Sequence, residues 1–308
     1  MHVLVTGGAG FIGSHSVEQL LEADFSVRIL DNFSTGSRKN LPTHSLLEIQ
    51  VGDIRDATAV HKAMDGITHV LHLAAQVSVQ ASVEDPCGSC STNIGGFVNV
   101  LQAARSCGVE RMVYASSAAV YGLPTRLPLR ETDGAQPCSP YGLEKYVNDQ
   151  YAALFAKEFG QSLLGLRYFN VYGPRQDPSS PYAGVISKFI SMIEQHRPLT
   201  VFGDGTQTRD FIFVKDIAKA NVQALQEEAT GVCNVATGRS VTLLDLIEVL
   251  SGCVNRKLDV VHLPVQAGDI PFSEADILKL SSIFPTQNMT SLNEGLLSLL
   301  KSSSNICP

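Results

Sequence analysis

The sequence predicts an α/β fold: a doubly wound parallel sheet covered by helices on both faces, followed by a smaller mixed α/β lobe. Three observations lead to this prediction. Short apolar runs rich in β-branched residues alternate with helical patterns up to about residue 170. A glycine-rich turn directly follows the first run. Polar or small residues stand where the runs end, and the carboxyl ends of parallel strands are where such sheets bind ligands.

The first run, His2–Thr6, leads into a turn with glycine at every third position, and a helical pattern opens within that turn. Glycines allow a tight turn and a close approach of the backbone to a ligand, and the helix amino terminus offers free N–H groups to a pyrophosphate. Strand, glycine turn and helix in this order predict a dinucleotide site of the Rossmann type; a plain tight turn is the alternative. The residues assigned to this site are Gly7, Gly10, Phe11, Ile12 and Gly13.

The second run, Ser26–Leu30, ends in Asp31 and Asn32. A carboxylate at the tip of the second strand can accept hydrogen bonds from an adenosine ribose and would repel a 2′-phosphate. This favours NAD over NADP as the cofactor. The residues that follow are either phosphate contacts or a polar loop: Ser34, Thr35 and Gly36.

The third run, Leu46–Val51, leads to Asp53 and Ile54. The carboxylate of Asp53 could meet the amino group of an adenine. A cap for the helix that starts near Ala57 explains this aspartate almost as well, so both interpretations stay open.

The fourth run, residues 69–75, ends in small side chains that leave room for a flat ligand. His69 and His72 within it stand three residues apart, a spacing that does not suit a metal pair on a strand. We interpret them as packing residues and expect no metal site. A long helix is expected over about residues 92–107, and the fifth run, Arg111–Ala115, ends in a pair of serines.

The residues Tyr141 and Lys145 predict a reaction centre. A helix is expected from about residue 139 to residue 159, and two residues four apart lie one turn from each other on the same helix face. A lysine ammonium beside a phenol favours the phenolate, so the tyrosine proton becomes available near neutral pH. Ser117, at the end of the fifth run, would complete a site that takes a proton from a substrate alcohol. The alternative is an amphipathic helix with a surface lysine.

The domain organisation follows from where the alternation stops. A sixth run, Ser162–Arg167, is followed by shorter elements and by loops rich in proline and glycine. We therefore expect a dinucleotide-binding domain over residues 1–170 and a smaller, discontinuous substrate-binding lobe over residues 171–308. The helical segment 214–228 is expected to return to the sheet.

Bulk properties exclude some classes of protein. The net charge of −7 argues against a nucleic-acid surface or an anionic membrane partner. Apolar runs stay shorter than the roughly 18 residues that a membrane helix needs, and the first residues lack the pattern of a signal peptide, so a cytoplasmic protein is expected. Seven scattered cysteines indicate reduced thiols rather than a disulfide framework; Cys87 and Cys90 form a pair without a second one nearby.

Taken together, these motifs resemble those of the extended short-chain dehydrogenases/reductases, and specifically the nucleotide-sugar epimerase/dehydratase family with its UDP-glucose and UDP-N-acetylglucosamine 4-epimerases. The resemblance covers nearly the whole chain. The segments that carry it are 6–13, 31–32, 52–54, 72–75, 116–122, 141–145, 167–170, 202–205, 209–214 and 268–269.

The resemblance implies an isomerase of carbohydrate metabolism with tightly bound NAD that is regenerated in each turnover. Tyr141 would take the proton of the sugar 4-hydroxyl, Ser117 would hydrogen-bond the same oxygen, and Lys145 would lower the pKa of the tyrosine. A transient 4-keto intermediate would be reduced on its other face, which inverts C4. The further cofactor contacts implied are Leu73, Ala74, Ala75, Gln76, Asn93, Ala115, Ser116, Tyr168 and Val171.

The resemblance also implies a set of substrate contacts, and family members commonly form homodimers through the helices expected over 92–107 and 139–159. Besides Ser117 and Tyr141, the substrate contacts implied are Asn170, Gly184, Val185, Thr200, Phe202, Arg209, Gln266 and Asp269. Gln266 stands where relatives have an arginine for the diphosphate. This departure leaves open whether UDP or dTDP is the carrier, and the identity of the sugar stays open as well.

The segment after Ser117 bears on the type of reaction. Family dehydratases carry an Asp-Glu pair there and decarboxylases carry a glutamate, whereas this chain has Ala118 and Ala119. Plain 4-epimerisation of a UDP-hexose or UDP-N-acetylhexosamine is therefore preferred. A UDP-uronate epimerase or decarboxylase is the second hypothesis, and an NAD-binding sensor without catalytic activity is the third.

Overall fold

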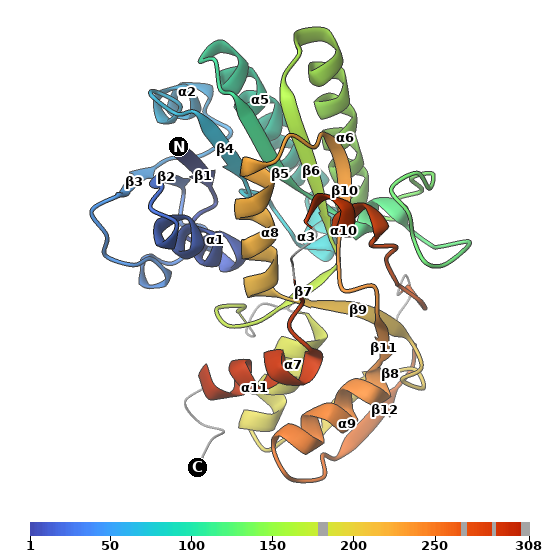
Figure 1. Ribbon diagram of the computed structural model, residues 1–308. Coiled ribbons are helices and arrows are strands. Elements are labelled where there is room, and N and C mark those ends of the chain that lie inside the picture. Colours follow the sequence, from blue (N-terminus) through green and yellow to red (C-terminus); the bar gives the residue numbers. More distant parts are fainter. Residues whose placement is uncertain (178–183, 266–269, 285–287, 303–308) are drawn as a thin grey trace.

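A computed structural model describes residues 1–177, 184–265, 270–284 and 288–302 of the chain. Figure 1 shows two lobes, an upper one built around a large sheet and a lower one in which helices pack on smaller sheets. Gln266 and Asp269, both expected to contact the substrate, lie outside the described residues. None of the described helices is long and apolar enough to cross a bilayer.

The upper lobe contains a seven-stranded parallel sheet with the strand order β10-β6-β5-β4-β1-β2-β3. Its strands are β1 (His2–Thr6), β2 (Ser26–Asp31), β3 (Leu47–Val51), β4 (His69–His72), β5 (Arg111–Ser117), β6 (Ser162–Tyr168) and β10 (Gly231–Val235). The doubly wound sheet and its first six strands are confirmed; β10 was not predicted. The chain adds β2 and β3 on one side of β1 and then β4 on the other, so β1 and β4 form the switch point at which such sheets bind ligands.

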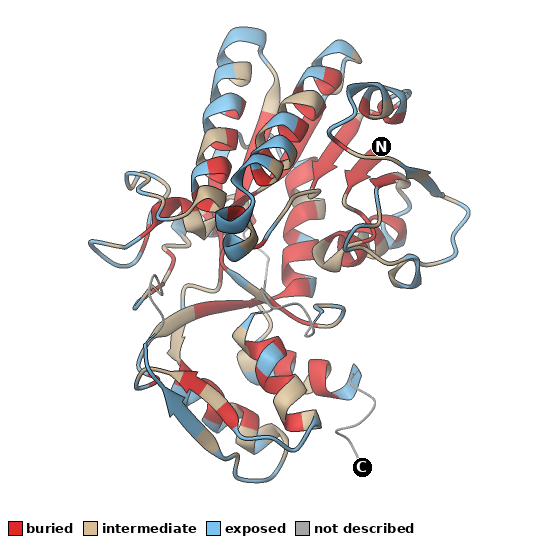
Figure 2. Ribbon diagram, turned by 180° about the vertical axis from the view of Figure 1, so that it is seen from behind, coloured by how far each residue is buried: buried red, intermediate tan, exposed pale blue. Residues whose placement is uncertain are grey.

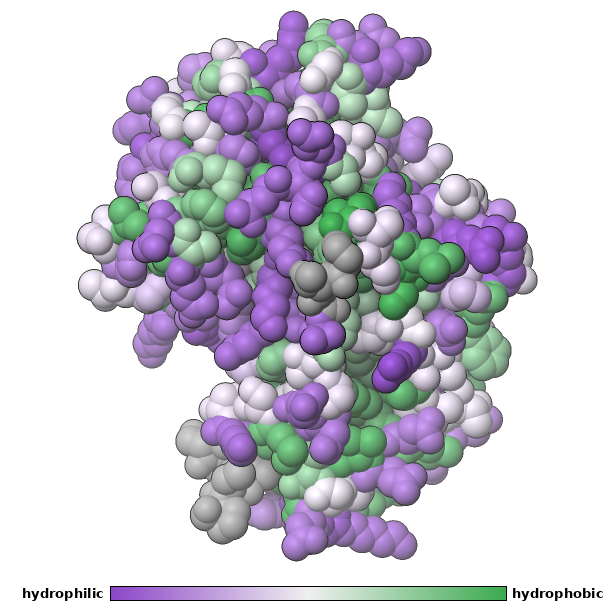
Figure 3. Space-filling view, viewed as in Figure 1, coloured by the Kyte–Doolittle hydropathy of each residue, from purple (hydrophilic) through white to green (hydrophobic). Residues whose placement is uncertain are grey.

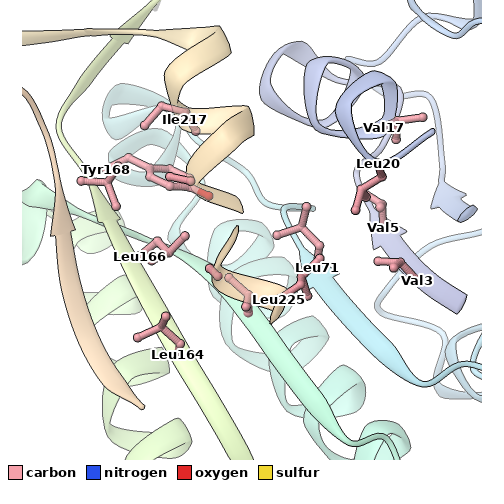
Figure 4. Packing of buried hydrophobic residues seen from close by; sticks show 14 of the residues in the cluster. Val3, Val5, Val17, Leu20, Leu71, Leu164, Leu166, Tyr168, Ile217 and Leu225 are labelled. Carbon is pink, nitrogen blue, oxygen red and sulfur yellow. The ribbon is translucent and has the colours of Figure 1, made fainter. Parts of the chain in front are cut away.

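Two layers of helices cover the sheet. On one face lie α1 (Phe11–Glu22) and α8 (Val214–Gln226), and on the other lie α2 (Ala57–Ala63), α5 (Phe97–Ser106) and α6 (Pro140–Phe159). Side chains alternate along β1: Val3 and Val5 join the first layer, where Figure 4 shows them near Val17 and Leu20, whereas Leu4 joins the second. Figure 2 shows the inner strands of this sheet buried and the outward sides of its helices exposed, whereas the edge strand β3 is partly exposed.

The helix expected over residues 92–107 is interrupted. A π-helical turn, Ser91–Gly96, follows the short helices α3 (Val79–Glu84) and α4 (Pro86–Cys90) and runs directly into α5. The apolar pattern of the segment does not distinguish a wide turn from an α-helical one. Such turns are frequent at functional sites.

The lower lobe contains two small sheets. One is formed by β7 (Asn170–Tyr172), β9 (Thr208–Phe213) and β11 (Ser240–Thr242), and the other by β8 (Leu199–Phe202) and β12 (Val260–Leu263). Helices α7 (Val185–Glu194), α9 (Leu243–Cys253) and α11 (Leu292–Ser302) pack on them around a separate hydrophobic core.

Two helices from the second half of the chain lie against the upper sheet. Helix α8 packs against α1, β4 and β5, and α10 (Leu278–Ile283) packs against β10. On the face shown in Figure 3, hydrophilic side chains predominate over the upper lobe, and hydrophobic ones show between them.

Candidate active site

The glycine turn between β1 and α1 needs glycine at two positions. Gly7 has φ +71°, and a Cβ on it would lie 2.7 Å from the Ala74 nitrogen at the end of β4. A Cβ on Gly13 would lie 2.1 Å from the carbonyl oxygen of Gly7. The turn is therefore folded onto itself and onto β4, with no room for larger side chains.

The N-cap residue of α1 is Gly10. Within the part of the chain that the structure describes, no side chain caps the first turn of this helix. Uncapped N–H groups and the positive end of the helix dipole suit the pyrophosphate of a dinucleotide, so the residues present fit NAD. The side chains of Phe11 and Ile12 are partly buried against the hydrophobic clusters, so these residues offer their backbone to such a ligand.

Asp31 connects the end of β2 to the glycine turn. Its carboxylate accepts the N–H of Ala9 at 2.9 Å and the N–H of Phe33 at 2.8 Å, and the residue is 7% exposed. Gly36 also lies against Ala9, where an added Cβ would be 2.9 Å from the backbone. The loop that contains Ser34 and Thr35 is thus held beside the turn, as a shared cofactor site requires.

Asp53 belongs to an exposed polar cluster near that loop. It accepts the Asn32 amide at 2.9 Å and two hydrogen bonds from the Arg55 guanidinium, which holds the pKa of this carboxyl well below its usual range. Helix α2 is capped by Asp56, so the interpretation of Asp53 as the helix cap is wrong. The side chain of Ile54 is buried in the core and does not face this cluster.

The end of β4 is shaped by small or buried groups. His72 is buried, its Nδ1 lies 2.8 Å from the Thr6 hydroxyl, and burial lowers its pKa to about 3, so the ring is neutral. The Ala74 N–H also donates to the Thr6 hydroxyl, at 3.3 Å, which fixes Leu73 to Ala75 beside the glycine turn.

Asn93, in the π-helical turn, does not point freely into this region. Its Oδ1 accepts the Gln76 N–H at 2.8 Å, and its Nδ2 donates to the Gln76 carbonyl oxygen at 2.8 Å. Asn93 therefore holds the main chain of the loop after β4.

The structure brings Ser117 and Tyr141 together. The Ser117 hydroxyl is near enough to the Tyr141 hydroxyl to lower its pKa, and the Ser117 Oγ accepts the Ala119 N–H at 3.1 Å. The Tyr141 N–H, at the start of α6, donates to the buried Ser82 hydroxyl at 3.1 Å. Sequence reasoning missed Ser82, because only the fold brings α3 against the first turn of α6.

Lys145 lies one turn further along α6. Its Nζ donates to the Ala115 carbonyl oxygen at 2.9 Å and lies 5.9 Å from the centre of the Tyr141 ring. Burial lowers the pKa of Lys145 to about 8, while the negative charges of Asp149 and Glu144 act against this change.

The expected lowering of the Tyr141 pKa is not found in the structure. Burial raises the pKa of Tyr141, the hydrogen bond from Ser117 lowers it, and the charge of Glu144 raises it further. Burial is the largest of these causes, and the Lys145 ammonium donates to the Ala115 carbonyl oxygen and lies 5.9 Å from the centre of the Tyr141 ring.

Two other predicted cofactor contacts, Tyr168 and Val171, have side chains packed in the hydrophobic cores. The side chain of Tyr168 points into the core, where its hydroxyl donates to Asn221 at 2.6 Å, and Val171 packs between the hydrophobic cores of the two lobes. Ala115 and Ser116 lie at the end of β5, beside the Lys145 contact.

The predicted substrate contacts lie in the lower lobe or at its boundary. Asn170 starts β7, Gly184 and Val185 start α7, Thr200 and Phe202 lie in β8, and Arg209 lies in β9. Phe202 lines a cavity of about 150 Å³ together with Val265, Pro271 and Phe272. Arg209 donates to the Thr208 carbonyl oxygen at 2.8 Å.

Sequence reasoning also missed Glu144, which lies between Tyr141 and Lys145 and is 4% exposed. A residue three positions after Tyr141 lies near its helix face, and this spacing was the available signal.

Comparison with known proteins agrees with this geometry. The model of the NAD dependent epimerase/dehydratase family matches residues 3–236. A putative UDP-glucose 4-epimerase of Methanocaldococcus jannaschii is 40% identical, over 91% of this chain and 92% of its own. UDP-glucuronate 4-epimerase 2 of Arabidopsis thaliana is 35% identical, over 96% of this chain and 74% of its own.

A solved structure is similar over its whole length. The UDP-N-acetylglucosamine 4-epimerase from Methanobrevibacter ruminantium, in complex with UDP-N-acetylmuramic acid, is 40% identical with a TM-score of 0.95, over 98% of each chain. The glycine turn, the uncapped helix and the family match thus point the same way: the chain belongs to the NAD-dependent epimerase/dehydratase family.

Proposed function

We propose that the protein catalyses NAD-dependent epimerisation at C4 of a UDP-hexose or UDP-N-acetylhexosamine. The observation that carries this proposal is the contact of Tyr141 with Ser117, with Lys145 one helical turn away, above the edge of the sheet that holds the glycine turn. Similarity to UDP-sugar 4-epimerases over nearly the whole chain supports it.

Tyr141 is the proton acceptor in this proposal. Bound NAD supplies a hydride acceptor and donor that is restored within one turnover. Ser117 bridges the sugar 4-hydroxyl and the phenol oxygen, which keeps the proton path short. Lys145, still largely protonated at neutral pH with its pKa of about 8, contributes a positive charge that favours the phenolate once the substrate is enclosed.

The residues around Ser117 favour epimerisation over elimination or decarboxylation. Ala118 and Ala119 offer no acid, and the buried carboxylate near Tyr141, that of Glu144, accepts hydrogen bonds from Asn93 and Ser89. A carboxylate occupied in this way is a poor general acid for loss of water.

We further propose that the nucleoside binds in the lower lobe. The cavity beside Phe202 offers apolar walls for a flat base, and the guanidinium of Arg209, in β9, suits a diphosphate. Gln266 and Asp269 stay predictions for the same part of the substrate.

A homodimer through α5 and α6 is also part of the proposal. Leu143, Tyr151 and Leu154 on α6 are between 36% and 51% exposed, which is unusual for apolar side chains on one helix. Leu101 on α5, by contrast, is fully buried within the protomer and is not available for such contacts. Light scattering should show wild type as a dimer and Leu154→Glu as a monomer. The same mass for wild type and Leu154→Glu would contradict this interface.

The test of the function is a time course by NMR with UDP- and dTDP-linked hexoses, N-acetylhexosamines and uronates. The proposal expects the 4-epimer of a neutral UDP-sugar to accumulate to equilibrium. Turnover of uronates alone would replace the proposal with a uronate epimerase, and release of CO2 would replace it with a decarboxylase.

A further inference from the structure

Glu144 is a buried carboxylate on the helix that carries Tyr141 and Lys145. Its Oε2 accepts two hydrogen bonds, from the Ser89 hydroxyl at 2.8 Å and from the Asn93 amide at 2.6 Å. Burying a carboxylate costs free energy unless hydrogen bonds compensate for the lost water, so this arrangement requires its two donors.

The Asn93 amide connects Glu144 to the loop after β4. It binds both the N–H and the carbonyl oxygen of Gln76, at 2.8 Å each. The Gln76 side chain in turn accepts the Ser78 N–H and donates to the Ser78 carbonyl oxygen. Ser78 caps α3, and Ser82 of α3 accepts the Tyr141 N–H at 3.1 Å.

These contacts form a closed circuit that starts and ends on the first turns of α6. It runs from Glu144 through Asn93 and the Gln76–Ser78 loop to Ser82 and back to Tyr141. Networks of this kind hold their members more rigidly than isolated pairs do. Because the loop lies at the carboxyl edge of the sheet, the circuit also fixes one wall of the site.

Titratable groups around Glu144 lie on its own helix, α6, and on β4. Its negative charge raises the pKa of Tyr141 and opposes the lowering of the Lys145 pKa by burial. Asp149, two turns after Tyr141, acts on Lys145 in the same direction, and His72 on β4 faces Lys145 as a neutral ring.

We propose that Glu144 is a positioning residue of the epimerase, which through Asn93 holds the Gln76–Ser78 loop and the first turn of α6 in the geometry that Tyr141 needs. This inference rests on the proposed function. Glu144 acts through Asn93 and Ser82 and is not itself a proton donor or acceptor in the reaction.

The test compares Glu144→Gln with Glu144→Ala. Glutamine keeps an acceptor oxygen for Asn93 and Ser89, so kcat should stay within about 3-fold of wild type, while the limb of the kcat–pH profile due to Tyr141 should move to lower pH because a negative charge is lost. Alanine removes the acceptor, and kcat should fall by about 10- to 100-fold with little change in KM. Glu158→Gln, on the exposed side of α6, is the matched control.

A double variant tests the path through Asn93. Glu144→Ala combined with Asn93→Ala should be no slower than Asn93→Ala alone, because both changes break the same link. Hydrogen–deuterium exchange adds a measurement without substrate. The backbone amides of residues 76–84 should exchange faster in Glu144→Ala than in wild type.

Each outcome separates the two proposals. If wild type epimerises no sugar, the proposed function is wrong, whereas an active wild type with an equally active Glu144→Ala overturns only the role of Glu144. Additive losses in the double variant, or unchanged exchange over residues 76–84, would also overturn it. If the alanine variant fails to fold, Glu144→Gln decides: an unshifted pH profile, or a loss of kcat as large as 10-fold, contradicts the proposal.

Discussion

The Lys145 ammonium donates a hydrogen bond to the Ala115 carbonyl oxygen at 2.9 Å, and so joins the catalytic helix to the end of β5. Lys145 is 2% exposed, and burial lowers its pKa to about 8. With this bond made, the ammonium lies 5.9 Å from the centre of the Tyr141 ring. The influence of the lysine on Tyr141 is therefore that of a nearby charge, and it depends on the lysine remaining protonated.

Lys145→Met should change how stability depends on pH. The unfolded lysine has the ordinary pKa of about 10.5 and the folded one a pKa of about 8. Between these values the unfolded state holds more protons, so the wild-type free energy of unfolding rises with pH. The variant lacks this contribution. We expect the free energy of unfolding of wild type minus that of the variant to increase by on the order of 1–2 kcal/mol from pH 7.5 to 9.5 in urea titrations. Parallel pH dependences would contradict the low pKa of Lys145.

Tyr141→Phe should remove turnover without removing the cofactor. The phenol oxygen is the proposed proton acceptor, and loss of a general base slows a reaction by about 10²- to 10⁴-fold. The dissociation constant for NAD should stay within about 3-fold, because most expected NAD contacts lie elsewhere. The measurements are the initial rate of epimerisation and NAD titration by calorimetry. Tyr151→Phe, on the exposed side of the same helix, is the control, and a Tyr141→Phe variant as active as that control would mean that another group takes the proton.

The sequence was sufficient for the parts of the fold that local patterns encode. Most of the inner strands are apolar runs because both faces of the sheet are covered there, whereas the edge strand β3 alternates apolar and polar residues and is partly exposed. Gly7, Asp31 and Ser117 lie at the carboxyl ends of strands, which meet at one edge of a parallel sheet. Strand β10 escaped prediction because Asn234 interrupts its apolar run. That asparagine is buried, accepts the Tyr121 hydroxyl at 2.6 Å and binds the Leu129 carbonyl oxygen, contacts that only the folded chain provides.

The electrostatics of the site could not be predicted in the same way. A tyrosine and a lysine on one helical turn predict proximity, and the structure gives a ring-to-ammonium distance of 5.9 Å. The direction in which the Tyr141 pKa shifts depends on burial by other elements and on the charge of Glu144. The hydrogen-bond partners of Glu144, Ser89 and Asn93, come from a different helical segment. Side-chain contacts between distant segments leave no local pattern.

Gly13→Ala should weaken NAD binding strongly. A methyl group there would lie 2.1 Å from the Gly7 carbonyl oxygen, so the turn must open and the free N–H groups of α1 move. We expect the NAD dissociation constant to rise at least about 10-fold, with a lower melting temperature. Gly252→Ala is the matched control: none of the described residues lies within 4 Å of its Cβ position in α9, and alanine there should stabilise the helix by about 0.5–1 kcal/mol. Equal NAD affinities in both variants would exclude the turn as the pyrophosphate site.

Asp149→Ala should destabilise the protein far more than loss of a surface ion pair does. Asp149 and Arg167 form an ion pair at 2.9 Å with side chains 2% and 6% exposed, and the Tyr114 hydroxyl donates to the same carboxylate. Removing one partner leaves an uncompensated buried charge, so the free energy of unfolding should fall by about 3–5 kcal/mol in denaturant titrations.

Two further variants distinguish charge burial from simple loss of packing at Asp149. Arg55→Ala, which breaks the exposed pair with Asp53, should cost less than about 1 kcal/mol. Asp149→Leu combined with Arg167→Met removes both charges and should be more stable than either single change, because no charge is left unpaired in the core. The double variant could instead be less stable than both Asp149→Leu and Arg167→Met. In that case packing around α6 and β6, rather than the unpaired charge, would explain the loss of stability in Asp149→Ala.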